Sequence, residues 1–438
     1  MKVYVHTWGC QMNVLDSEVL TGEFAAAGYT AAEGAADADV VILNTCSVRE
    51  HAENKVFSML GRLGQIKSQR PELKVVLAGC MAQRLGGRIK KRYPHVDLVV
   101  GTRRIGDCLE LLGRIEGPGA GVHIEEDVQS YPRRYVSSRA SRAQAFVSVM
   151  RGCDNFCAYC IVPYVRGRQA SRPAGEIVDE VRALAADGVK EITLLGQNIT
   201  AYGRDGGATV SLAGLLETLN GVEGIEWIKF VTSHPRDTDE DVFEAMRDLP
   251  KVCRYLHLPA QSGSDAVLER MGRGYTRSEY LEKIGHLRET AGEVSVASDF
   301  IVGFPGETER DFGDTVELVR TVGYKNSFIF KYSPREGTAA AAMIDDVPIQ
   351  EKKRRNNALL RVQEEASLAH NSGFVGRTVR VLVEGPSKKD ASRLSGRTEG
   401  EEIVIFDGEI GLTGSFLNIE ITGATAIALF GKKQAAGK

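Results

Sequence analysis

Short apolar runs alternate with helically spaced segments along the first 117 residues. Four such runs are candidate strands: 3–7, 40–44, 74–79 and 98–101. Between them, apolar residues recur every three or four positions over 14–27, 50–69 and 82–92, which indicates amphipathic helices. Strands that alternate with helices are typical of a parallel, doubly wound sheet. The pattern therefore predicts an α/β domain over 1–117 and a Gly- and Pro-containing linker over 118–138.

Residues 139–370 repeat the strand-then-helix unit six times. The candidate strands are 145–150, 191–195, 226–231, 254–258, 295–301 and 327–331. The candidate helices are 174–187, 211–220, 238–248, 276–291 and 307–322, followed by a polar helix from 349 to about 370. Six units are too few for a closed eight-stranded barrel. We therefore predict a partial (βα)6 barrel related to the TIM barrel.

The pattern changes to period two after Gly373. Apolar and polar residues alternate over 378–383, 403–406, 416–421 and 425–429, and glycine turns separate these runs. This predicts a small antiparallel β-barrel over 371–434, of a size that suits oligonucleotide-binding barrels. The charges of this region nearly cancel, so its composition alone does not indicate RNA binding.

Composition places the chain among soluble globular proteins. Its 438 residues are 43% apolar and 26% charged, and at about 100–200 residues per domain they predict two to four domains. No apolar run is long enough to cross a membrane, and the N-terminus reads as a strand, not as a signal peptide. We therefore expect a cytoplasmic protein without membrane contact.

The net charge of −3 conceals two basic segments. Residues 84–104 carry seven Lys and Arg against Asp97, and residues 133–172 carry eight Arg against Asp154. Clustered arginine can contact phosphate, although a solvated surface is the commoner use of such a cluster.

The cysteines suggest the chemistry. Cys153, Cys157 and Cys160 are spaced C-x-x-x-C-x-x-C, too close for mutual disulfides and one ligand short of a structural zinc site. Three thiolates suit three irons of a 4Fe–4S cube and leave the fourth iron open for a substrate. The alternative is a set of buried cysteines or a redox switch.

The cluster loop follows the first strand of the predicted barrel, at the carboxyl end, where such folds place their chemistry. Other strand ends on this edge carry polar residues, among them His234, and our candidate cofactor contacts are Gln197, Asn198, Ser233, Gln261, Ser262 and Arg335. Glycines in 301–307 would let the backbone approach a bound adenine or ribose. Polar residues at strand ends are often only caps, so their shared edge is what favours a cofactor site.

A second group of cysteines follows strands of the first domain. Cys10, Cys46 and Cys80 come after the runs at 3–7, 40–44 and 74–79. In a parallel sheet the carboxyl ends meet at one edge, so we expect a second three-cysteine cluster there. The alternative is three small residues that pack at strand ends. Cys108 and Cys253 have no such placement and are interpreted as core residues.

The triplet and its placement resemble the radical S-adenosylmethionine superfamily. That resemblance implies that the open iron binds the amino and carboxylate groups of S-adenosylmethionine, whose reductive cleavage yields a 5′-deoxyadenosyl radical. Two clusters followed by a small barrel resemble, along nearly the whole chain, the methylthiotransferases of that superfamily. Segments 8–13, 44–50, 79–84 and 160–168 are similar to the branch that acts on prenylated adenosine, and 395–398 to its RNA-binding TRAM domain.

The resemblance implies a transferase that places a methylthio group on C2 of N(6)-dimethylallyladenosine at position 37 of tRNA, beside the anticodon. It implies two 4Fe–4S clusters, on Cys10, Cys46 and Cys80 and on Cys153, Cys157 and Cys160. S-Adenosylmethionine would be both methyl donor and radical source. Expected partners are a tRNA anticodon stem-loop, a sulfur source and an electron donor such as flavodoxin or ferredoxin, with the protein a monomer. Segment 197–203 departs from the family pattern, which leaves fine substrate preference open.

Three other functions remain possible at this point. A sister methylthiotransferase would act on threonylcarbamoyladenosine in tRNA or on an aspartate of a ribosomal protein. A non-catalytic iron–sulfur sensor would bind RNA without cleaving S-adenosylmethionine. Residues 1–117 could be a flavodoxin-like electron carrier, but no phosphate-binding glycine loop follows the first strand, which ends in Thr7 and Trp8.

Overall fold

The computed structural model describes residues 1–47, 50–115, 121–125, 139 and 141–434, so most of the predicted linker lies outside the described residues. The chain forms two compact units. The first comprises Met1–Ala140, Phe146–Asp154 and Ile161–Arg172, and the second comprises Ser141–Ala145, Asn155–Cys160 and Pro173–Lys438. Among the described residues, no helix combines the length and apolar character that a bilayer crossing requires.

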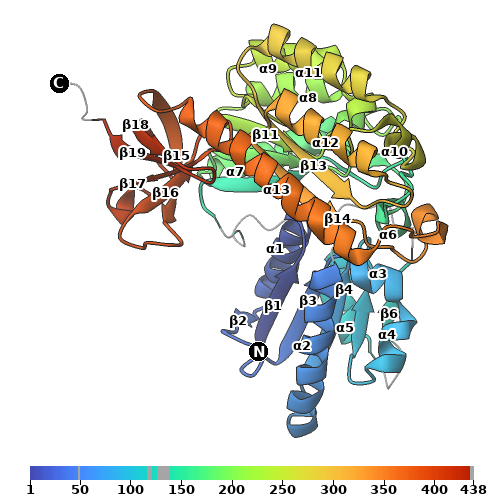
Figure 1. Cartoon of the computed structure of the whole chain (residues 1–438). Coiled ribbons are helices and arrows are strands. Elements are labelled where there is room, and N and C mark those ends of the chain that lie inside the picture. Colours follow the sequence, from blue (N-terminus) through green and yellow to red (C-terminus); the bar gives the residue numbers. More distant parts are fainter. Residues whose placement is uncertain (48–49, 116–120, 126–138, 140, 435–438) are drawn as a thin grey trace. The chain divides into compact units, whose positions relative to one another are not determined.

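The first unit is built on a parallel sheet in the order β2-β1-β3-β4-β5-β6 (Figure 1). Its strands are β1 (Lys2–Trp8), β2 (Thr30–Ala31), β3 (Val40–Thr45), β4 (Lys74–Gly79), β5 (Leu98–Val100) and β6 (Val122–His123). Its helices are α1 (Gln11–Ala26), α2 (Glu50–Gln69), α3 (Cys80–Leu85), α4 (Gly87–Arg92), α5 (Cys108–Gly113) and α6 (Val162–Arg166). A two-stranded ribbon, β8 (Met150–Arg151) with β9 (Ala170–Ser171), completes it.

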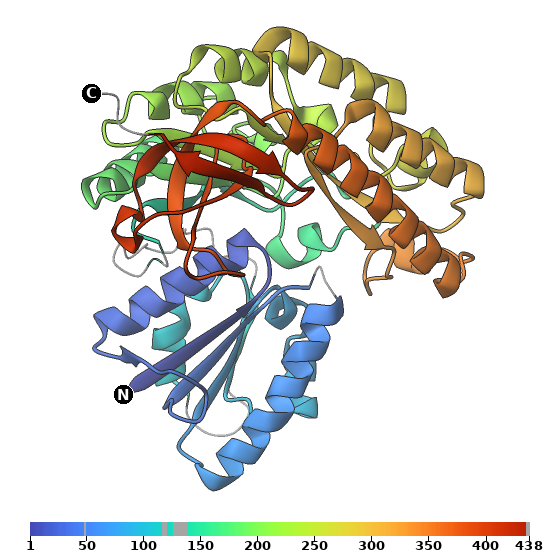
Figure 2. The ribbon, with the colours of Figure 1, turned by 60° about the vertical axis from the view of Figure 1, so that its left-hand side comes forward.

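Helices cover both faces of this sheet, and Figure 2 shows α1 and α2 on opposite sides. Val41 and Leu43 of β3 pack in the cluster that contains α2, whereas Val40 and Ile42 pack in the cluster that contains α1. Because both faces are buried, β3 is apolar at its first four positions, Val40–Leu43, as is typical of parallel strands. The prediction of a doubly wound parallel sheet is confirmed.

Local details differ from the sequence prediction. The predicted helix 82–92 is interrupted at Gly86, where φ is +48°, and forms α3 and α4. Strands β2 and β6 have only two residues each, too few to show an apolar pattern, and β6 lies within the stretch expected to be a linker. The predicted strand 145–150 is two strands, β7 (Gln144–Ser148) and β8.

The second unit contains the barrel-like core. After β7, which begins in this unit, its strands are β10 (Glu191–Leu195), β11 (Trp227–Val231), β12 (Tyr255–His257), β13 (Ser295–Val302) and β14 (Asn326–Lys331). The pairs β10–β11, β12–β13 and β13–β14 are parallel. Its helices are α7 (Ala174–Ala186), α8 (Leu212–Asn220), α9 (Glu240–Asp248), α10 (Asp265–Arg270), α11 (Arg277–Ala291), α12 (Glu309–Val322) and α13 (Ile349–Ser372). The helix α10 was not predicted because six residues carry too little periodicity.

The C-terminal strands close into a barrel in the order β15-β16-β17-β19-β18. They are β15 (Thr378–Pro386), β16 (Leu394–Arg397), β17 (Ile403–Phe406), β18 (Phe416–Ala424) and β19 (Leu429–Lys433). The predicted strand 425–429 was wrong, because Thr425 and Ala428 form a turn and the strand begins at Leu429. The prediction missed β16, and the β17–β19 pair is parallel, so the barrel is not wholly antiparallel.

The barrel packs on the amino ends of the core strands within the second unit. Trp227 meets Phe416 edge to face, with ring centroids 4.7 Å apart. Beside them the ammonium of Lys229 lies 2.8 Å from Glu191 of β10 and 2.5 Å from Glu401 of the barrel. A buried cation between two carboxylates therefore joins the barrel to the core.

Candidate iron–sulfur and cofactor sites

Three cysteines of the first unit follow three adjacent strands at the same edge. Trp8, Thr45 and Gly79 are paired across β1, β3 and β4, and each ends its strand. Cys46 and Cys80 come one residue later, and Cys10 comes two residues later at the start of α1. The parallel register thus brings to one edge thiols that are 36 and 34 positions apart in sequence.

Buried amides hold the loops that carry these cysteines. Asn13 of α1 donates to Asn44 Oδ1 at 3.1 Å, and Asn44 donates back to the Asn13 carbonyl at 2.8 Å and to Ser17 Oγ at 2.9 Å. Gly79 has φ of +91°, and a β-carbon there would lie 2.5 Å from Asn44 Oδ1. Only glycine fits this position, which places Cys80 at the first residue of α3.

A buried arginine adjoins the thiol of Cys80. The guanidinium of Arg166 lies 2.8 Å from Asp16 Oδ2, and both side chains are almost fully buried. Burial raises the pKa of the Cys80 thiol, and the charge of Arg166 and its hydrogen bond to Cys80 oppose that rise. The arginine therefore favours the thiolate, which is the form that binds iron.

Among the described residues, no three Cys, His, Asp or Glu side chains meet at a point that could hold a single metal ion. A four-iron cube binds each thiolate on a different iron, so its ligands stand apart around the cluster. Cysteines grouped at a sheet edge, with an arginine beside one of them, fit such a cluster better than a mononuclear site.

The second cysteine group lies in the loop after β8. Cys153 belongs to the first unit, where its amide donates to the Gly167 carbonyl at 3.2 Å. Cys157 and Cys160 belong to the second unit, where the Cys160 amide donates to the Cys157 carbonyl at 2.9 Å. Phe156, which lies between Cys153 and Cys157 in the sequence, has φ of 45°, a strained value for an aromatic residue. Such strain is common in ligand-binding loops.

Unsatisfied polar atoms gather at the carboxyl ends of β10 and β11. Both amide atoms of Gln197, the Ser233 hydroxyl and His234 Nε2 are shielded from solvent and have no hydrogen-bond partner among the described residues. Thr232, just before Ser233, has φ of 70°, an outlier for a β-branched residue. Buried groups without partners are costly, so this edge is suited to a polar ligand. S-Adenosylmethionine, with its amino acid and ribose groups, has the chemistry they require.

His234 is neutral at physiological pH. Burial and the positive charges of Arg273 and Arg236 lower the pKa of its imidazole to about 2, against the opposing charge of Asp237. Its Nδ1 accepts a hydrogen bond from the Arg236 amide at 3.2 Å. The proton is therefore on Nε2, where a ligand oxygen can accept it.

The other predicted contacts have partners within the protein. Asn198 donates to Asp237 at 2.6 Å, and Ser262 bonds Thr315 at 3.3 Å. Gln261 has φ of 69° and bridges β13 through its backbone. The carbonyl of Arg335, whose side chain is half-buried, accepts from Thr338.

Two residues that the sequence pattern did not single out organise the cluster loop. Asp237 accepts hydrogen bonds from Asn155 at 3.0 Å and from Asn198, and it pairs with Arg204 at 3.3 Å. Arg273, in the turn after α10, donates to the Cys157 sulfur at 3.4 Å. Asp237 is the last residue of a three-residue 3-10 helix, Pro235–Asp237, and Arg273 lies outside any helix or strand, so no periodic pattern marks them and only their contacts reveal them.

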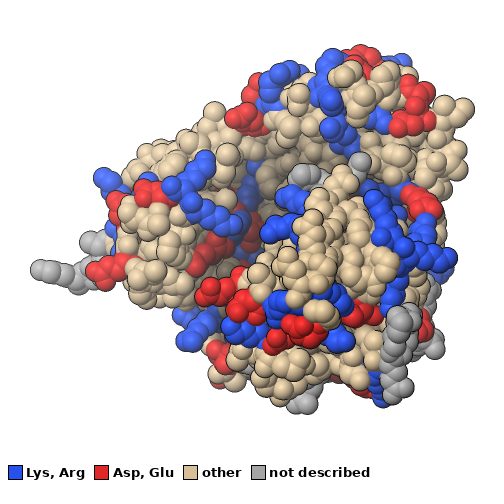
Figure 3. Space-filling view, turned by 90° about the horizontal axis from the view of Figure 1, so that it is seen from below, with Lys and Arg blue, Asp and Glu red and all other residues tan. Residues whose placement is uncertain are grey.

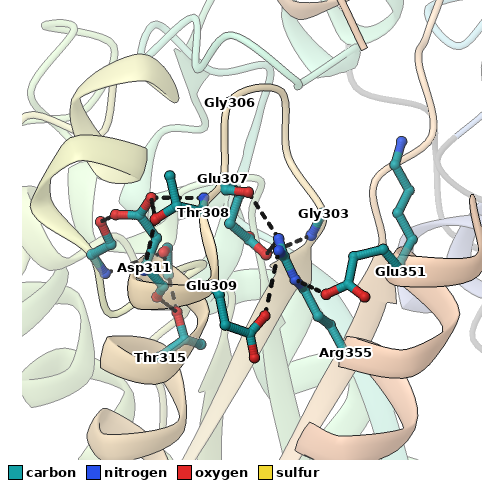
Figure 4. Close-up of polar contacts among 12 residues, drawn as sticks. Gly303, Gly306, Glu307, Thr308, Glu309, Asp311, Thr315, Glu351 and Arg355 are labelled. Atoms are coloured by element: carbon teal, nitrogen blue, oxygen red, sulfur yellow. Dashed lines mark hydrogen bonds and ion pairs between the residues drawn. The ribbon is translucent and has the colours of Figure 1, made fainter. Parts of the chain in front are cut away.

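The glycine-containing turn after β13 is held by α13 (Figure 4). The Gly303 amide donates to Glu307 at 3.0 Å, and Arg355 donates to the same carboxylate at 2.8 Å. Burial raises the pKa of Glu307, and these two bonds oppose the rise. Gly303 has φ of +70°, and a β-carbon there would lie 2.4 Å from Lys352 Cγ. The turn is thus a rigid backbone surface.

The exposed charges are mixed in sign on the face of the molecule that Figure 3 draws. In Figure 3, Lys and Arg occur in several groups with Asp and Glu between them. Arg84 is paired with Glu53 at 2.8 Å, whereas Arg88, Lys91 and Arg92 are exposed. Arg88 also donates to the Arg84 carbonyl at 3.2 Å, and the guanidinium of Arg92 lies 4.7 Å from the centre of the Phe57 ring.

Comparison with known proteins assigns the chain. Residues 2–101 match uncharacterized protein family UPF0004, residues 147–319 the radical SAM superfamily, and residues 374–433 the TRAM domain. The chain is 47% identical over 433 residues to the tRNA-2-methylthio-N(6)-dimethylallyladenosine synthase of Moorella thermoacetica, covering 97% of each chain. It belongs to the family of these synthases. The synthase of Desulfitobacterium hafniense is 42% identical, with 99% of this chain and 98% of that one covered.

Membership confirms the predicted family, and it makes the protein a radical S-adenosylmethionine enzyme with S-adenosylmethionine and 4Fe–4S clusters as cofactors. Among solved structures, the fold is similar to the radical S-adenosylmethionine methyltransferase TsrM from Kitasatospora setae, which has cobalamin and a 4Fe-4S cluster bound. The TM-score is 0.55 at 14% identity, covering 78% of this chain and 77% of that one. The structural likeness shows the fold alone.

Proposed function

We propose that this protein transfers a methylthio group to C2 of N(6)-dimethylallyladenosine at position 37 of tRNA. The observation that carries the proposal is the grouping of Cys10, Cys46 and Cys80 at one sheet edge, separate from the triplet that begins at Cys153. A radical enzyme needs one cluster to cleave S-adenosylmethionine. A second open cluster suits an enzyme that must also deliver sulfur.

The six cysteines have two roles in this proposal. Cys153, Cys157 and Cys160 hold the cluster that generates a radical from S-adenosylmethionine, and the other three hold the auxiliary cluster that presents the sulfur. Gln197, Ser233 and the Nε2–H of neutral His234 orient the cofactor, because these groups lack partners within the described protein. Asn198, Gln261, Ser262 and Arg335 support the same edge.

The partners follow from the chemistry. The target C2–H lies within a base of the anticodon loop, so the base must leave its stack to be reached. The TRAM barrel and the exposed cations of segment 84–104 contact the anticodon stem-loop. A one-electron donor such as flavodoxin or ferredoxin and a separate sulfur source are required.

Two cysteine variants test the assignment. We expect Cys46→Ala to lose about half of the reconstituted iron and all methylthiolation while it still releases 5′-deoxyadenosine, because the radical cluster remains. Cys157→Ala should lose the other half of the iron and both products. Cys253→Ala, which removes a buried thiol from a core cluster, is the matched control and should keep the iron of the wild type. Methylthiolated product from Cys46→Ala would contradict the auxiliary site.

Two further measurements separate the alternatives. Nucleoside analysis of tRNA from a deletion strain should show loss of 2-methylthio-dimethylallyladenosine, and its persistence would favour a sister substrate. Iron-replete protein with dithionite and S-adenosylmethionine should release 5′-deoxyadenosine. An iron–sulfur sensor would release none.

A further inference from the structure

Arg273 is a buried cation that has no carboxylate partner among the residues that the structure describes. Only 4% of the surface of this residue is exposed to solvent. Its bonds go to neutral oxygens and one sulfur: the Pro259 carbonyl at 2.8 Å, the hydroxyls of Tyr275 and Tyr159 at 3.1 and 3.3 Å, and Cys157 Sγ at 3.4 Å. Guanidinium does not lose its proton in proteins. A buried charge without a counter-charge strongly destabilises a protein, so we expect an anion beside this guanidinium in the functional protein.

The cluster loop and the Arg273 turn are attached to each other. The Ala158 amide donates to the Met271 carbonyl at 2.8 Å. The Tyr275 hydroxyl donates in turn to the Ala260 carbonyl at 2.7 Å. These backbone contacts fix the guanidinium beside Cys157 independently of any ion pair.

The second buried arginine offers an internal comparison. Arg166 stands beside Cys80, but Asp16 at 2.8 Å neutralises it. Arg273 has no such counter-charge among the described residues. Among the described groups that contact Arg273, only the thiol of Cys157 becomes negative when the protein binds its cluster.

We propose that Arg273 is a positioning residue that balances the charge of the radical-generating cluster through an N–H···S bond to Cys157 and thereby raises the cluster's reduction potential. The inference rests on the cluster assignment made under Proposed function. A cube with three thiolates is anionic and becomes more so when it accepts one electron from the donor. A fixed cation and a hydrogen bond to a ligand sulfur therefore stabilise the reduced form.

The test uses the full chain with Cys10, Cys46 and Cys80 replaced by Ala, so that a single cluster is observed. In this background we expect Arg273→Met to keep the iron and to lower the midpoint potential in an EPR-monitored redox titration. The reduced-to-oxidised ratio at the parent midpoint should fall by about tenfold, which is 59 mV for one electron. Arg273→Lys keeps the charge but not the forked geometry, and it should shift less.

Arg247→Met is the matched control. Arg247 is an exposed arginine of α9 that pairs with Asp248 at 2.8 Å, and its replacement should leave the midpoint unchanged. If the Arg273→Met protein retains its iron and its cluster has the same midpoint potential as the parent protein, then Arg273 only holds the two loops together. That result would overturn the inference. A background that takes up no iron would overturn the cluster assignment itself.

A measurement without any Arg273 variant covers the case in which the variants lose their cluster. The full chain with the three Cys→Ala replacements is produced with 15N-labelled arginine, its cluster is reduced, and the protein is examined by pulsed EPR. A 15N hyperfine coupling to the reduced cluster supports an arginine in contact with a ligand sulfur. The absence of coupling in iron-replete protein overturns it.

Discussion

At the scale of single residues, Asp237 decides the geometry of the cluster loop. It joins Asn155, which lies between two cluster cysteines, to Asn198 and Arg204, both in the segment that follows β10. Burial alone would raise the pKa of Asp237, but the bonds from Asn155 and Asn198 and the charges of His234 and Arg236 lower it. A single carboxylate thus holds polar groups from three segments in one arrangement.

We therefore expect Asp237→Asn to destabilise the protein and loosen the loop. The amide keeps the size of the side chain but replaces an acceptor of charge-assisted bonds, so the free energy of unfolding should fall by about 2–3 kcal/mol. Urea unfolding followed by circular dichroism measures this, and iron uptake should fall in parallel. Asp248→Asn, at an exposed ion pair on α9, should match the wild type in both measurements. Equal stability of the two variants would show that the Asp237 network is not structural.

At the scale of elements, the seam between the TRAM barrel and the amino ends of β10 and β11 depends on Lys229. Its side chain is 1% exposed and lies between Glu191 and Glu401. The cost of burying these charges is offset only while all three are present. The seam therefore holds the barrel in one position on the core.

Lys229→Met should lower the free energy of unfolding by about 3 kcal/mol, because buried Glu191 loses its counter-charge and half-buried Glu401 keeps only its ion pair with Arg397. The triple variant Lys229→Met, Glu191→Gln, Glu401→Gln should recover most of that loss, because no charge remains uncompensated. Denaturant unfolding of the single and triple variants makes the comparison. A triple variant no more stable than the single one would assign the effect to packing against Trp227 instead of charge.

At the scale of the whole molecule, another buried carboxylate of the barrel, Glu402, makes the second unit sensitive to acid. Glu402 accepts bonds from Ser295 at 2.7 Å and from His370 of α13 at 3.0 Å. Burial alone would raise the pKa of Glu402, but the bonds from His370 and Thr398 and the charge of Lys325 lower it from 4.5 to about 2. One carboxylate thereby ties the core, α13 and the barrel together.

The pH dependence follows from the direction of that shift. Between pH 4.5 and 2 the unfolded chain binds the proton and the folded chain does not, so stability falls as pH falls. We expect the contribution of Glu402, on the order of 3 kcal/mol, to be present above pH 4.5 and lost towards pH 2. At pH 7 the free energy of unfolding of Glu402→Gln should be lower than that of the wild type. Between pH 4.5 and 2 it should also fall less steeply, as denaturant unfolding at a series of pH values would show. If the free energy of unfolding fell equally steeply in both proteins, the assignment would be contradicted.

The apolar pattern by itself was enough to predict the doubly wound sheet, the partial barrel and the small β-barrel. Buried parallel strands such as β3, whose first four residues are all apolar, carry a signal that can be recognised without tertiary information. Cys153, Cys157 and Cys160 are close in sequence, so their spacing alone indicates a cluster. Cys10, Cys46 and Cys80 required one further step, the rule that parallel strands end at one edge.

Only the tertiary structure decided which charged groups matter. Asp237, Arg273 and the Lys229 seam draw partners from positions tens to hundreds of residues apart, and no local pattern marks them. The two-residue strands and β16 were missed because hydrogen bonding to neighbours, and not side-chain pattern, makes them strands. Periodicity records which face is buried. It does not record which distant group lies against that face. The free-energy cost of a buried charge depends on whether that group offsets it.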